Sequence, residues 1–248
     1  MSQPLKDPQR IYTAALVIIG NEILSGRTQD ANTNYIAKGL VERGIRLSEV
    51  RVVPDIEDRI IEAVNALRNA VDYVFTTGGI GPTHDDITAQ SIANAFGIPL
   101  ILHEEAYRVL LDHYGSEEAV TPARAKMAMT PEGAQLISNP VSGAPGFVIG
   151  NVYIMAGVPR IMQAMFDAAL ETLEGGAIIL SRTVECPFPE SAIAEQLTAL
   201  QGEYPDIDMG SYPVYQNGEH STSLVLRGTD EPRLSEAERV LTEIVKGL

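Results

Sequence analysis

The segment Thr76–Asp86 reads Thr-Thr-Gly-Gly-Ile-Gly-Pro-Thr-His-Asp-Asp, and its residue types are well suited to binding an anion. Its three glycines let the backbone turn sharply and bring N–H groups close to a ligand. Thr77 and Thr83 add hydroxyl donors, and a helix expected to begin at Asp86 would add its positive end. The segment has neither the Lys-Ser/Thr of a Walker A loop nor the spacing of a dinucleotide fingerprint, so it predicts a phosphate-binding loop of another kind.

Two adjacent carboxylates, Asp85 and Asp86, follow this loop. They would repel a phosphate unless a cation bridged them, which predicts a divalent metal ion at Asp86. The alternative is structural, because either aspartate could cap the helix that follows, an interaction that contributes ~0.5–2 kcal/mol. Glu22 leaves a similar choice open, between a metal or ribose contact and an exposed loop carboxylate.

Apolar runs alternate with segments of helical spacing over the first part of the chain. The predicted strands are Ile11–Gly20, Arg46–Val53, Val71–Thr77, Phe147–Ile149 and Val152–Met155. The predicted helices are Asp30–Gly44, a segment from Ile56 to Leu67, Asp86–Phe96, His103–Tyr114, Pro122–Met129 and Val158–Leu173. This alternation predicts βαβ units and an α/β fold with a doubly wound, mostly parallel sheet.

Polar segments directly follow four of these strands. They are Asn21-Glu22, Pro54-Asp55, Gly78–Asp86 and Gly157–Pro159. The carboxyl ends of parallel strands share one edge of the sheet, where open α/β sheets bind their ligands. We therefore expect the four segments to line a single site.

The pattern changes after Gly175-Gly176, which we expect to be a domain boundary. A strand is expected at Ala177–Val184 and a helix at Glu190–Leu200. Two strands are expected on the two sides of Asn217-Gly218, and a last helix at Leu234–Lys246. The Asn-Gly pair is a strong hairpin signal. The sequence thus predicts a flexible leader over residues 1–10, a first domain over 11–174 and a smaller α+β domain of βαββα order over 175–248.

The charge and cysteine content exclude several classes of protein. With 18 basic and 33 acidic residues the net charge is −15, which disfavours binding to nucleic acid or to anionic membranes. A single cysteine, Cys186, excludes an internal disulfide and a Cys-rich zinc site, and no apolar stretch is long enough to span a membrane. We expect a cytoplasmic protein.

The four histidines lack metal-ligand spacing, and His84 alone lies in the loop.

The motifs resemble those of a known family. The glycine loop, Thr77–Asp86, is similar to the signature of the molybdopterin-binding (MoaB/Mog) domain. A second motif, Asn21–Gly26 with Asp30 and Asn32, narrows the resemblance to the CinA group. That group also resembles the N-terminal domain of eukaryotic FAD synthases. The match extends through Asn139-Pro140, Gly143–Phe147 and Gly157–Pro159. The segments Pro189–Ser191, Gly210–Pro213 and Leu226–Gly228 resemble the small KH-type domain of CinA proteins.

The resemblance implies which residues form the site. The glycine loop would bind the phosphate of a pterin or the pyrophosphate of a nucleotide, and Asp55 and Asp86 match acidic positions linked to metal and catalysis. From the residues alone, Asp55 could equally cap a helix beginning near Ile56. The expected binding residues are Asn21, Glu22, Asn32, Thr77, Gly78, Gly79, Gly81, Pro82, Thr83, Asp85, Gly157 and Pro159.

The resemblance also implies an activity. CinA proteins like this one are ADP-ribose pyrophosphatases that need a divalent ion, of the Mg, Mn or Co class, and potassium. The alternatives are a non-catalytic binder of molybdopterin or a nucleotide and, less favoured, a molybdopterin adenylyltransferase. A homodimer is expected, with a trimer as the alternative. The C-terminal amidase is expected to be absent, since the chain ends at Leu248. The sequence departs from the family's pattern at two positions. Ile161 stands where the family usually has a glutamate, and Met127 stands where it commonly has a glutamine.

Overall fold

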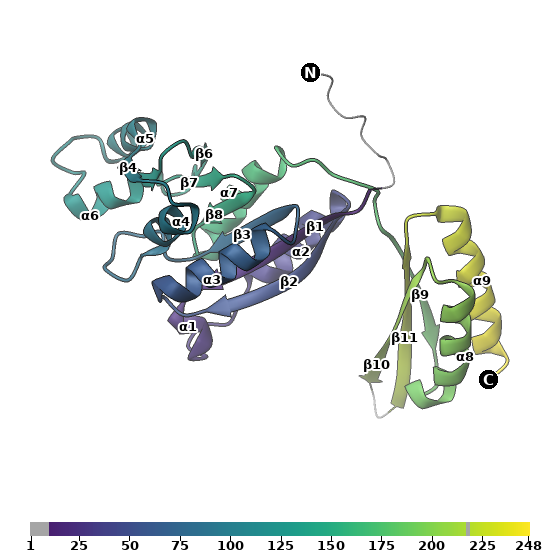
Figure 1. Ribbon diagram of the computed structural model, residues 1–248. Coiled ribbons are helices and arrows are strands. Elements are labelled where there is room, and N and C mark those ends of the chain that lie inside the picture. The colour runs from purple at the N-terminus through teal and green to yellow at the C-terminus, as the bar shows by residue number, and fades with distance from the viewer. Residues whose placement is uncertain (1–9, 217–218) are drawn as a thin grey trace, which may run out of the picture. The chain divides into compact units, whose positions relative to one another are not determined.

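The computed structural model describes residues 10–216 and 219–248, which form two compact units, Arg10–Gly176 and Ala177–Leu248 (Figure 1). The expected leader, apart from Arg10, and the expected turn at Asn217-Gly218 lie outside the described residues.

The first unit is built on a six-stranded sheet with the strand order β2-β1-β3-β8-β7-β6. In that order the strands are Ile45–Val53, Tyr12–Ile19, Tyr73–Thr77, Val152–Met155, Gly146–Ile149 and Gln135–Ile137. The first four run parallel, whereas β7 pairs antiparallel with both β8 and β6. The prediction of a mostly parallel, doubly wound sheet is confirmed.

Helices cover both faces of this sheet, which is why its central strands are apolar throughout. The helices of this unit are α1 Asn21–Leu24, α2 Asn32–Glu42, α3 Glu57–Arg68, α4 Thr88–Phe96, α5 Glu104–Tyr114, α6 Pro122–Ala125 and α7 Pro159–Leu170. Strand β1 turns Leu16 and Ile18 toward the core that includes α2 and α7. It turns Val17 and Ile19 toward the core that includes α3 and α4.

Three local predictions are wrong. Asn21 and Glu22 begin the one-turn helix α1 rather than a loop. The helix expected from Asp86 begins at Thr88. The helix expected over Pro122–Met129 ends at Ala125 and is followed by a short 3₁₀ helix, Lys126–Ala128, and by strand β5, Met129–Pro131. Strand β5 pairs with β4, Leu100–Leu102, a long-range partner that local helical spacing does not reveal.

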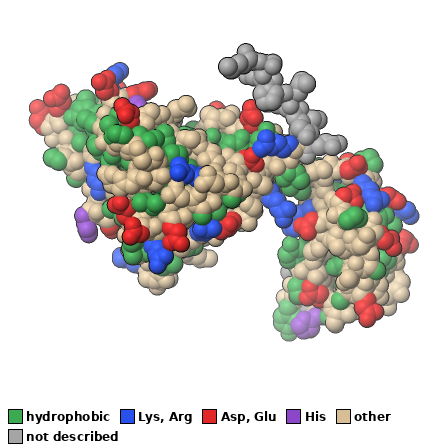
Figure 2. All heavy atoms as spheres, viewed as in Figure 1, with side chains coloured by type: hydrophobic (Ala, Val, Ile, Leu, Met, Phe, Trp, Pro, Cys, Tyr) green, Lys and Arg blue, Asp and Glu red, His purple; other side chains and the backbone are tan. Residues whose placement is uncertain are grey.

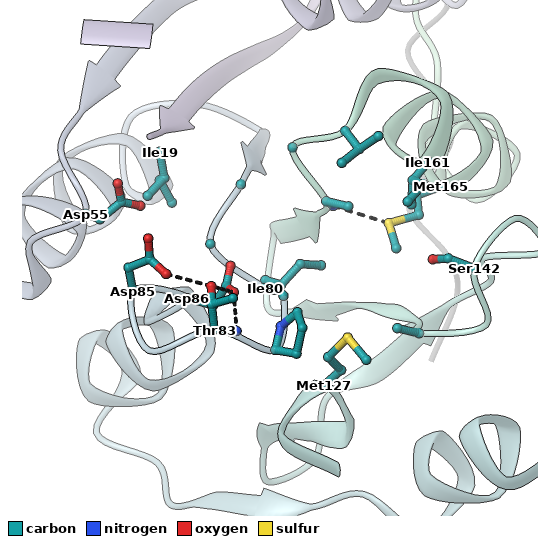
Figure 3. A pocket seen from close by; sticks show the side chains of 18 of the residues that line it. Ile19, Asp55, Ile80, Thr83, Asp85, Asp86, Met127, Ser142, Ile161 and Met165 are labelled. Carbon is teal, nitrogen blue, oxygen red and sulfur yellow. Dashed lines mark hydrogen bonds between the residues drawn. The ribbon is translucent and has the colours of Figure 1, made fainter. Parts of the chain in front are cut away.

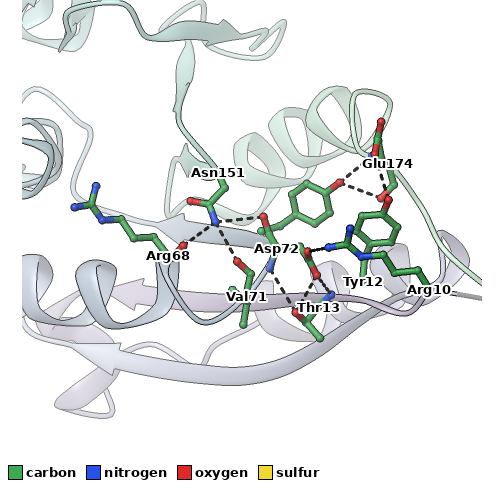
Figure 4. A network of polar contacts seen from close by, with 9 residues as sticks. Arg10, Tyr12, Thr13, Arg68, Val71, Asp72, Asn151 and Glu174 are labelled. Carbon is green, nitrogen blue, oxygen red and sulfur yellow. Dashed lines mark hydrogen bonds and ion pairs between the residues drawn. The ribbon is translucent and has the colours of Figure 1, made fainter. Parts of the chain in front are cut away.

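A polar network closes the amino edge of the sheet (Figure 4). The carboxylate of Asp72 accepts hydrogen bonds from the N–H of Thr13 (2.8 Å) and its hydroxyl (3.1 Å), and it pairs with Arg10. The side-chain amide of Asn151 donates to the carbonyls of residues 68, 71 and 72. Burial raises the pKa of Tyr73, in the same network, to about 12. This edge is therefore filled by contacts within the protein.

The second unit has the order β9, α8, β10, β11 and α9, as the sequence predicted. The bounds are Leu180–Cys186, Glu190–Glu203, Asp208–Gln216, Glu219–Gly228 and Glu231–Lys246. Its antiparallel sheet has the order β10-β11-β9, and both helices contribute to its own core. Cys186 is buried in that core, as expected of a packed side chain. In the described part of the chain, no helix has the length and hydropathy needed to cross a membrane.

Candidate functional site

The carboxyl ends of β1, β2, β3 and β8 surround one cavity of about 530 Å³ (Figure 3). This size suits a drug- or nucleotide-sized ligand. From these strand ends the lining residues are Ile19, Glu22, Thr28, Asp55, Gly78–Thr83, Asp85, Asp86 and Ala156–Pro159. The remaining lining residues are Met127, Asn139, Ser142, Ala144, Ile161 and Met165. All four polar segments singled out in the sequence thus meet here.

The backbone of the loop after β3 requires glycine at its first two positions. Gly78 and Gly79 have φ angles of 104° and 68°. A Cβ on Gly78 would clash with the carbonyl oxygen of Ile19, and one on Gly79 would clash with the Thr88 hydroxyl. Side chains are disfavoured at both positions by conformation and by space.

Hydrogen bonds fix this loop in place. Gly78 donates its N–H to Met155 (3.1 Å), and Thr88 returns its N–H to Gly79 (3.0 Å) and its hydroxyl to the Gly78 carbonyl (3.0 Å). Within the described residues, the next three N–H groups, from Gly79 to Gly81, have no partner in the protein. These backbone donors are available to an anion.

Asp86 and Asp85 hold the far end of the loop through Thr83. The Asp86 Oδ2 accepts a hydrogen bond from the Thr83 N–H at 2.8 Å, and the Thr83 hydroxyl lies 2.6 Å from both carboxylates. The hydrogen bond from Thr83 lowers the pKa of Asp85, helped by its own N–H and by the charges of His84 and Lys126. Asp85 therefore stays ionised to a lower pH than usual.

The prediction that Asp55 or Asp86 caps the helix that follows it is wrong. Helix α4 has Ile87 at its N-cap position and no side-chain cap. Helix α3 likewise has Ile56 at its N-cap position without a side-chain cap. Asp55 instead accepts the backbone N–H of Asn21 at 2.9 Å, which fixes the start of α1. Neither Asp55 nor Asp86 caps the helix that follows it.

Three of the expected binding residues do not line the main cavity. Asn32 and Thr77 line a separate cavity of about 40 Å³, shared with Glu22, Gly157 and Pro159. The Asn32 amide donates to the Gly157 carbonyl at 2.9 Å, so it positions the loop after β8. Asn21 lines neither cavity and contributes its backbone N–H to Asp55.

The main cavity has two chemically different sides. Figure 3 shows Asp55, Asp85 and Asp86 on one side and Met127, Ile161 and Met165 on the other. Sequence reasoning about the strand ends did not assign the second side. The motif around Asn139 and Gly143 is the sequence feature that could have located this side of the cavity. The Asn139 side chain holds Ser142 and Ala144 in place at the cavity wall.

No lysine or arginine is among the described residues that line the main cavity, whereas four carboxylates are. The ammonium of Lys126 donates to the Thr83 carbonyl, and Lys126 lines a smaller neighbouring cavity of about 50 Å³ together with Gly79–Gly81 and Asp86. Across the described part of the chain, no three His, Cys, Asp or Glu side chains form a preassembled metal site. A cation here would need ligand or water oxygens in addition to carboxylates, as is usual for Mg²⁺.

Comparison with known proteins agrees with this architecture. Residues 15–175 match the family described as "Probable molybdopterin binding domain", and residues 178–247 match "FAD synthase, middle domain". A protein of Archaeoglobus fulgidus is 37% identical over 198 residues, which cover 80% of this chain and 84% of that protein. A CinA-like protein of Desulfosudis oleivorans is 34% identical over 209 residues, covering 79% of this chain and 51% of that longer protein.

A solved structure gives the same result. CinA from Thermoplasma acidophilum matches with a TM-score of 0.61 and 36% identity, covering 64% of this chain and 96% of that one. The fold is thus that of an α/β protein with a cavity at the carboxyl edge of a mostly parallel sheet. The chain belongs to the molybdopterin-binding domain family, and its homologues include CinA-like proteins. The resemblance found in the sequence is confirmed.

Proposed function

We propose that this protein is a cytoplasmic, metal-dependent pyrophosphatase that hydrolyses ADP-ribose or a related dinucleotide such as FAD. The observation that carries the proposal is the make-up of the cavity. Backbone N–H groups suited to a pyrophosphate lie beside four carboxylates, with no basic side chain among the described lining residues. This arrangement favours a phosphorylated ligand that arrives with a divalent cation.

Asp55 and Asp86 are the residues best placed to hold that cation. Each uses its Oδ2 in a hydrogen bond with the backbone, which fixes the carboxylate and leaves Oδ1 available. Carboxylate and phosphate oxygens together match the ligand preference of Mg²⁺ and Mn²⁺. A bound ion of this kind would offset negative charge on the phosphoryl oxygens.

The residues divide the reaction between them. The N–H groups of Gly79–Gly81 bind phosphate oxygens and orient the pyrophosphate. Water attacks one phosphorus and the bridging P–O bond on that phosphorus breaks, so that the bridging oxygen leaves with the other phosphate. The protons of the water pass to the products and to solvent, and the products are two phosphate monoesters. The apolar side, with Met127, Ile161 and Met165, would receive the flat ring of the nucleoside or pterin and exclude water from it.

The second candidate is a non-catalytic binder of molybdopterin or a nucleotide. It is favoured by the absence, within the described residues, of a preassembled metal site of three or more ligands. A molybdopterin adenylyltransferase is the third candidate, and the CinA-like second unit disfavours it.

Incubation with ADP-ribose, FAD and NAD, with several divalent ions and with potassium, separates these functions. We expect monophosphate products with at least one ion, and loss of turnover when a chelator removes it. Mass spectrometry of the products is the measurement. Binding of ADP-ribose or molybdopterin without hydrolysis under every metal condition would favour the non-catalytic binder instead.

The second unit is not expected to bind RNA, despite the KH-type resemblance. From Gly175 onward the chain has 5 basic and 12 acidic residues, a net charge of −7. Arg182, Arg227, Arg233 and Lys246 all form ion pairs with acidic neighbours, and Figure 2 shows basic side chains interspersed with acidic ones. Micromolar, salt-sensitive binding of the fragment 177–248 to single-stranded RNA, measured by fluorescence anisotropy, would contradict this expectation.

A further inference from the structure

A small cavity adjoins the main one, and the two share part of their lining, including Glu22, Gly157 and Pro159. Its volume of about 40 Å³ is enough for a water molecule. Asn32 and Thr77 also line it, and they are 6% and 1% exposed. Among the described residues, the Oδ1 of Asn32 and the Oγ1 of Thr77 are buried and have no hydrogen-bond partner. Two buried polar side chains therefore border a cavity of water size with hydrogen bonds still to be made.

These two atoms determine what the small cavity can hold. Buried polar atoms in folded proteins nearly always bond to protein or to ordered water. The Asn32 amide nitrogen donates to the Gly157 carbonyl at 2.9 Å, which orients the side chain and leaves its Oδ1 to accept a hydrogen bond. The Thr77 hydroxyl can donate or accept. One water that donates to Asn32 and accepts from Thr77 satisfies both atoms and keeps its second proton for another acceptor.

Glu22 can be that acceptor. Of the carboxylates in the described part of the chain, it alone lines both the small cavity and the main one. No described residue donates a hydrogen bond to its carboxylate, whereas Asp55 and Asp86 each accept a backbone N–H. Both side-chain oxygens of Glu22 can therefore accept from water.

Gly20 provides the space in which the Glu22 carboxylate lies. A Cβ on Gly20 would be 2.5 Å from Glu22 Oε1 and 2.6 Å from its Oε2, so the carboxylate occupies the place that a side chain at position 20 would take. The φ angle of Gly20 is 165°, an extended conformation that other residues also adopt. Glycine is therefore needed here by the position of the carboxylate and not by the backbone.

We propose that Glu22 is the proton acceptor for the attacking water, and that Asn32 and Thr77 hold this water in the small cavity beside it. The inference rests on the proposed function, the hydrolysis of a pyrophosphate. The water oxygen bonds to one phosphorus, one of its protons passes to a Glu22 oxygen, and the bridging P–O bond breaks with its electron pair on the bridging oxygen. Glu22 then releases the proton to solvent. Gly20 is a positioning residue, because it acts only through Glu22.

Two other roles for Glu22 lead to different kinetics. A ligand of the divalent cation would set the metal concentration needed for half-maximal rate. A contact to a ribose hydroxyl in both the bound substrate and the transition state would set KM and leave kcat unchanged. A proton acceptor acts on kcat. Steady-state kinetics therefore separate the three roles.

Glu22→Gln tests the role directly, because glutamine is nearly isosteric with glutamate but does not accept a proton. We expect kcat for ADP-ribose to fall by roughly 100-fold. The KM for ADP-ribose and the half-maximal metal concentration should stay unchanged. Glu62→Gln on α3 is the matched control, since Glu62 is an exposed glutamate that lines neither cavity. It should keep the full rate.

Gly20→Ala tests the positioning of the carboxylate. The methyl group can be accommodated by moving the flexible end of Glu22, so thermal stability should change little. Displacement of the carboxylate should lower kcat by roughly tenfold or more. In a Glu22→Gln background the same substitution should have no further effect on kcat, because the two changes remove one interaction. An equal loss of rate in both backgrounds would show that Gly20 does not act through Glu22.

A crystal structure of the unsubstituted chain tests the water without any substrate. An ordered water should lie within hydrogen-bonding distance of Asn32 Oδ1 and Thr77 Oγ1. An empty cavity, or a metal ion in place of the water, would overturn the assignment of this cavity.

The kinetic outcomes distinguish this inference from the proposed function. No hydrolysis by the unsubstituted chain with any ion overturns the proposed function and, with it, the role of Glu22. Hydrolysis that Glu22→Gln does not slow overturns the role of Glu22 alone. The same holds if Glu22→Gln changes KM or the metal requirement and leaves kcat at saturating metal and substrate unchanged.

Discussion

Asp86→Asn is expected to lower the turnover of ADP-ribose by roughly 100-fold or more while leaving the loop folded. An amide is nearly isosteric with a carboxylate but is a much poorer ligand for a hard cation. The asparagine oxygen can still accept the Thr83 N–H bond that holds the loop at 2.8 Å. The effect should therefore appear in kcat and in the metal concentration needed for half-maximal rate, with little change in thermal stability.

Asp85→Asn is the matched control for this change. Asp85 has the more exposed side chain and contacts the same Thr83 hydroxyl, but the Thr83 N–H that holds the loop donates to Asp86 and not to Asp85. A smaller loss of rate is expected. If Asp86 were the N-cap of α4, asparagine would cap the helix about as well and the substitution would have little effect. Helix α4 has no side-chain cap, so this explanation does not apply. Equal rates for Asp86→Asn and the unsubstituted enzyme across metal concentrations would show that Asp86 holds no catalytic metal.

Gly78→Ala is expected to destabilise the protein by about 3 kcal/mol or more and to abolish binding of ADP-ribose. The residue has a φ of 104°, which alanine rarely adopts, and its Cβ would clash with the carbonyl oxygen of Ile19. Relief of that clash must move the loop away from β1, which takes the N–H groups of Gly79–Gly81 out of alignment. Urea unfolding gives the stability, and isothermal titration with ADP-ribose and Mg²⁺ gives the affinity.

Gly97→Ala separates backbone conformation from crowding. Gly97 also has a positive φ, 65°, but nothing lies within 4 Å of its Cβ position. Its replacement should cost about 1 kcal/mol, from the left-handed conformation alone, and should leave affinity unchanged. If Gly78→Ala is no more destabilised than Gly97→Ala and still binds ADP-ribose, the close approach of the loop to β1 does not control the site.

The sequence determined five of the six strands of the sheet, all except β6, and the location of the cavity. Continuous apolar runs such as Ile11–Gly20 predicted strands buried on both faces, and β1 is covered on both faces. Polar segments after four of those runs predicted a shared site, because parallel strands place their carboxyl ends at one edge. The cavity lined by Glu22, Asp55, Gly78–Thr83, Asp85, Asp86 and Gly157–Pro159 is at that edge.

The sequence did not determine what each carboxylate binds. Asp55 and Asp86 each precede a helix, so local reasoning allowed a helix cap at both. The structure shows them bonded to the backbones of Asn21 and Thr83 instead. The partner of Asp55 is 34 residues away and is brought near by the pairing of β1 with β2. Local propensity contains no information about such contacts.

The assembly of the apolar side of the cavity was decided by tertiary structure, although the motif around Asn139 indicated part of its wall. Met127, Ile161 and Met165 come from a 3₁₀ turn and from α7, which are separate in sequence and individually resemble ordinary core positions. In the same way, composition gave β2 its strand character but did not show that it ends as an exposed edge. Strand order depends on which chain segments pack together, a sum of many weak long-range contacts that no local pattern of residues records.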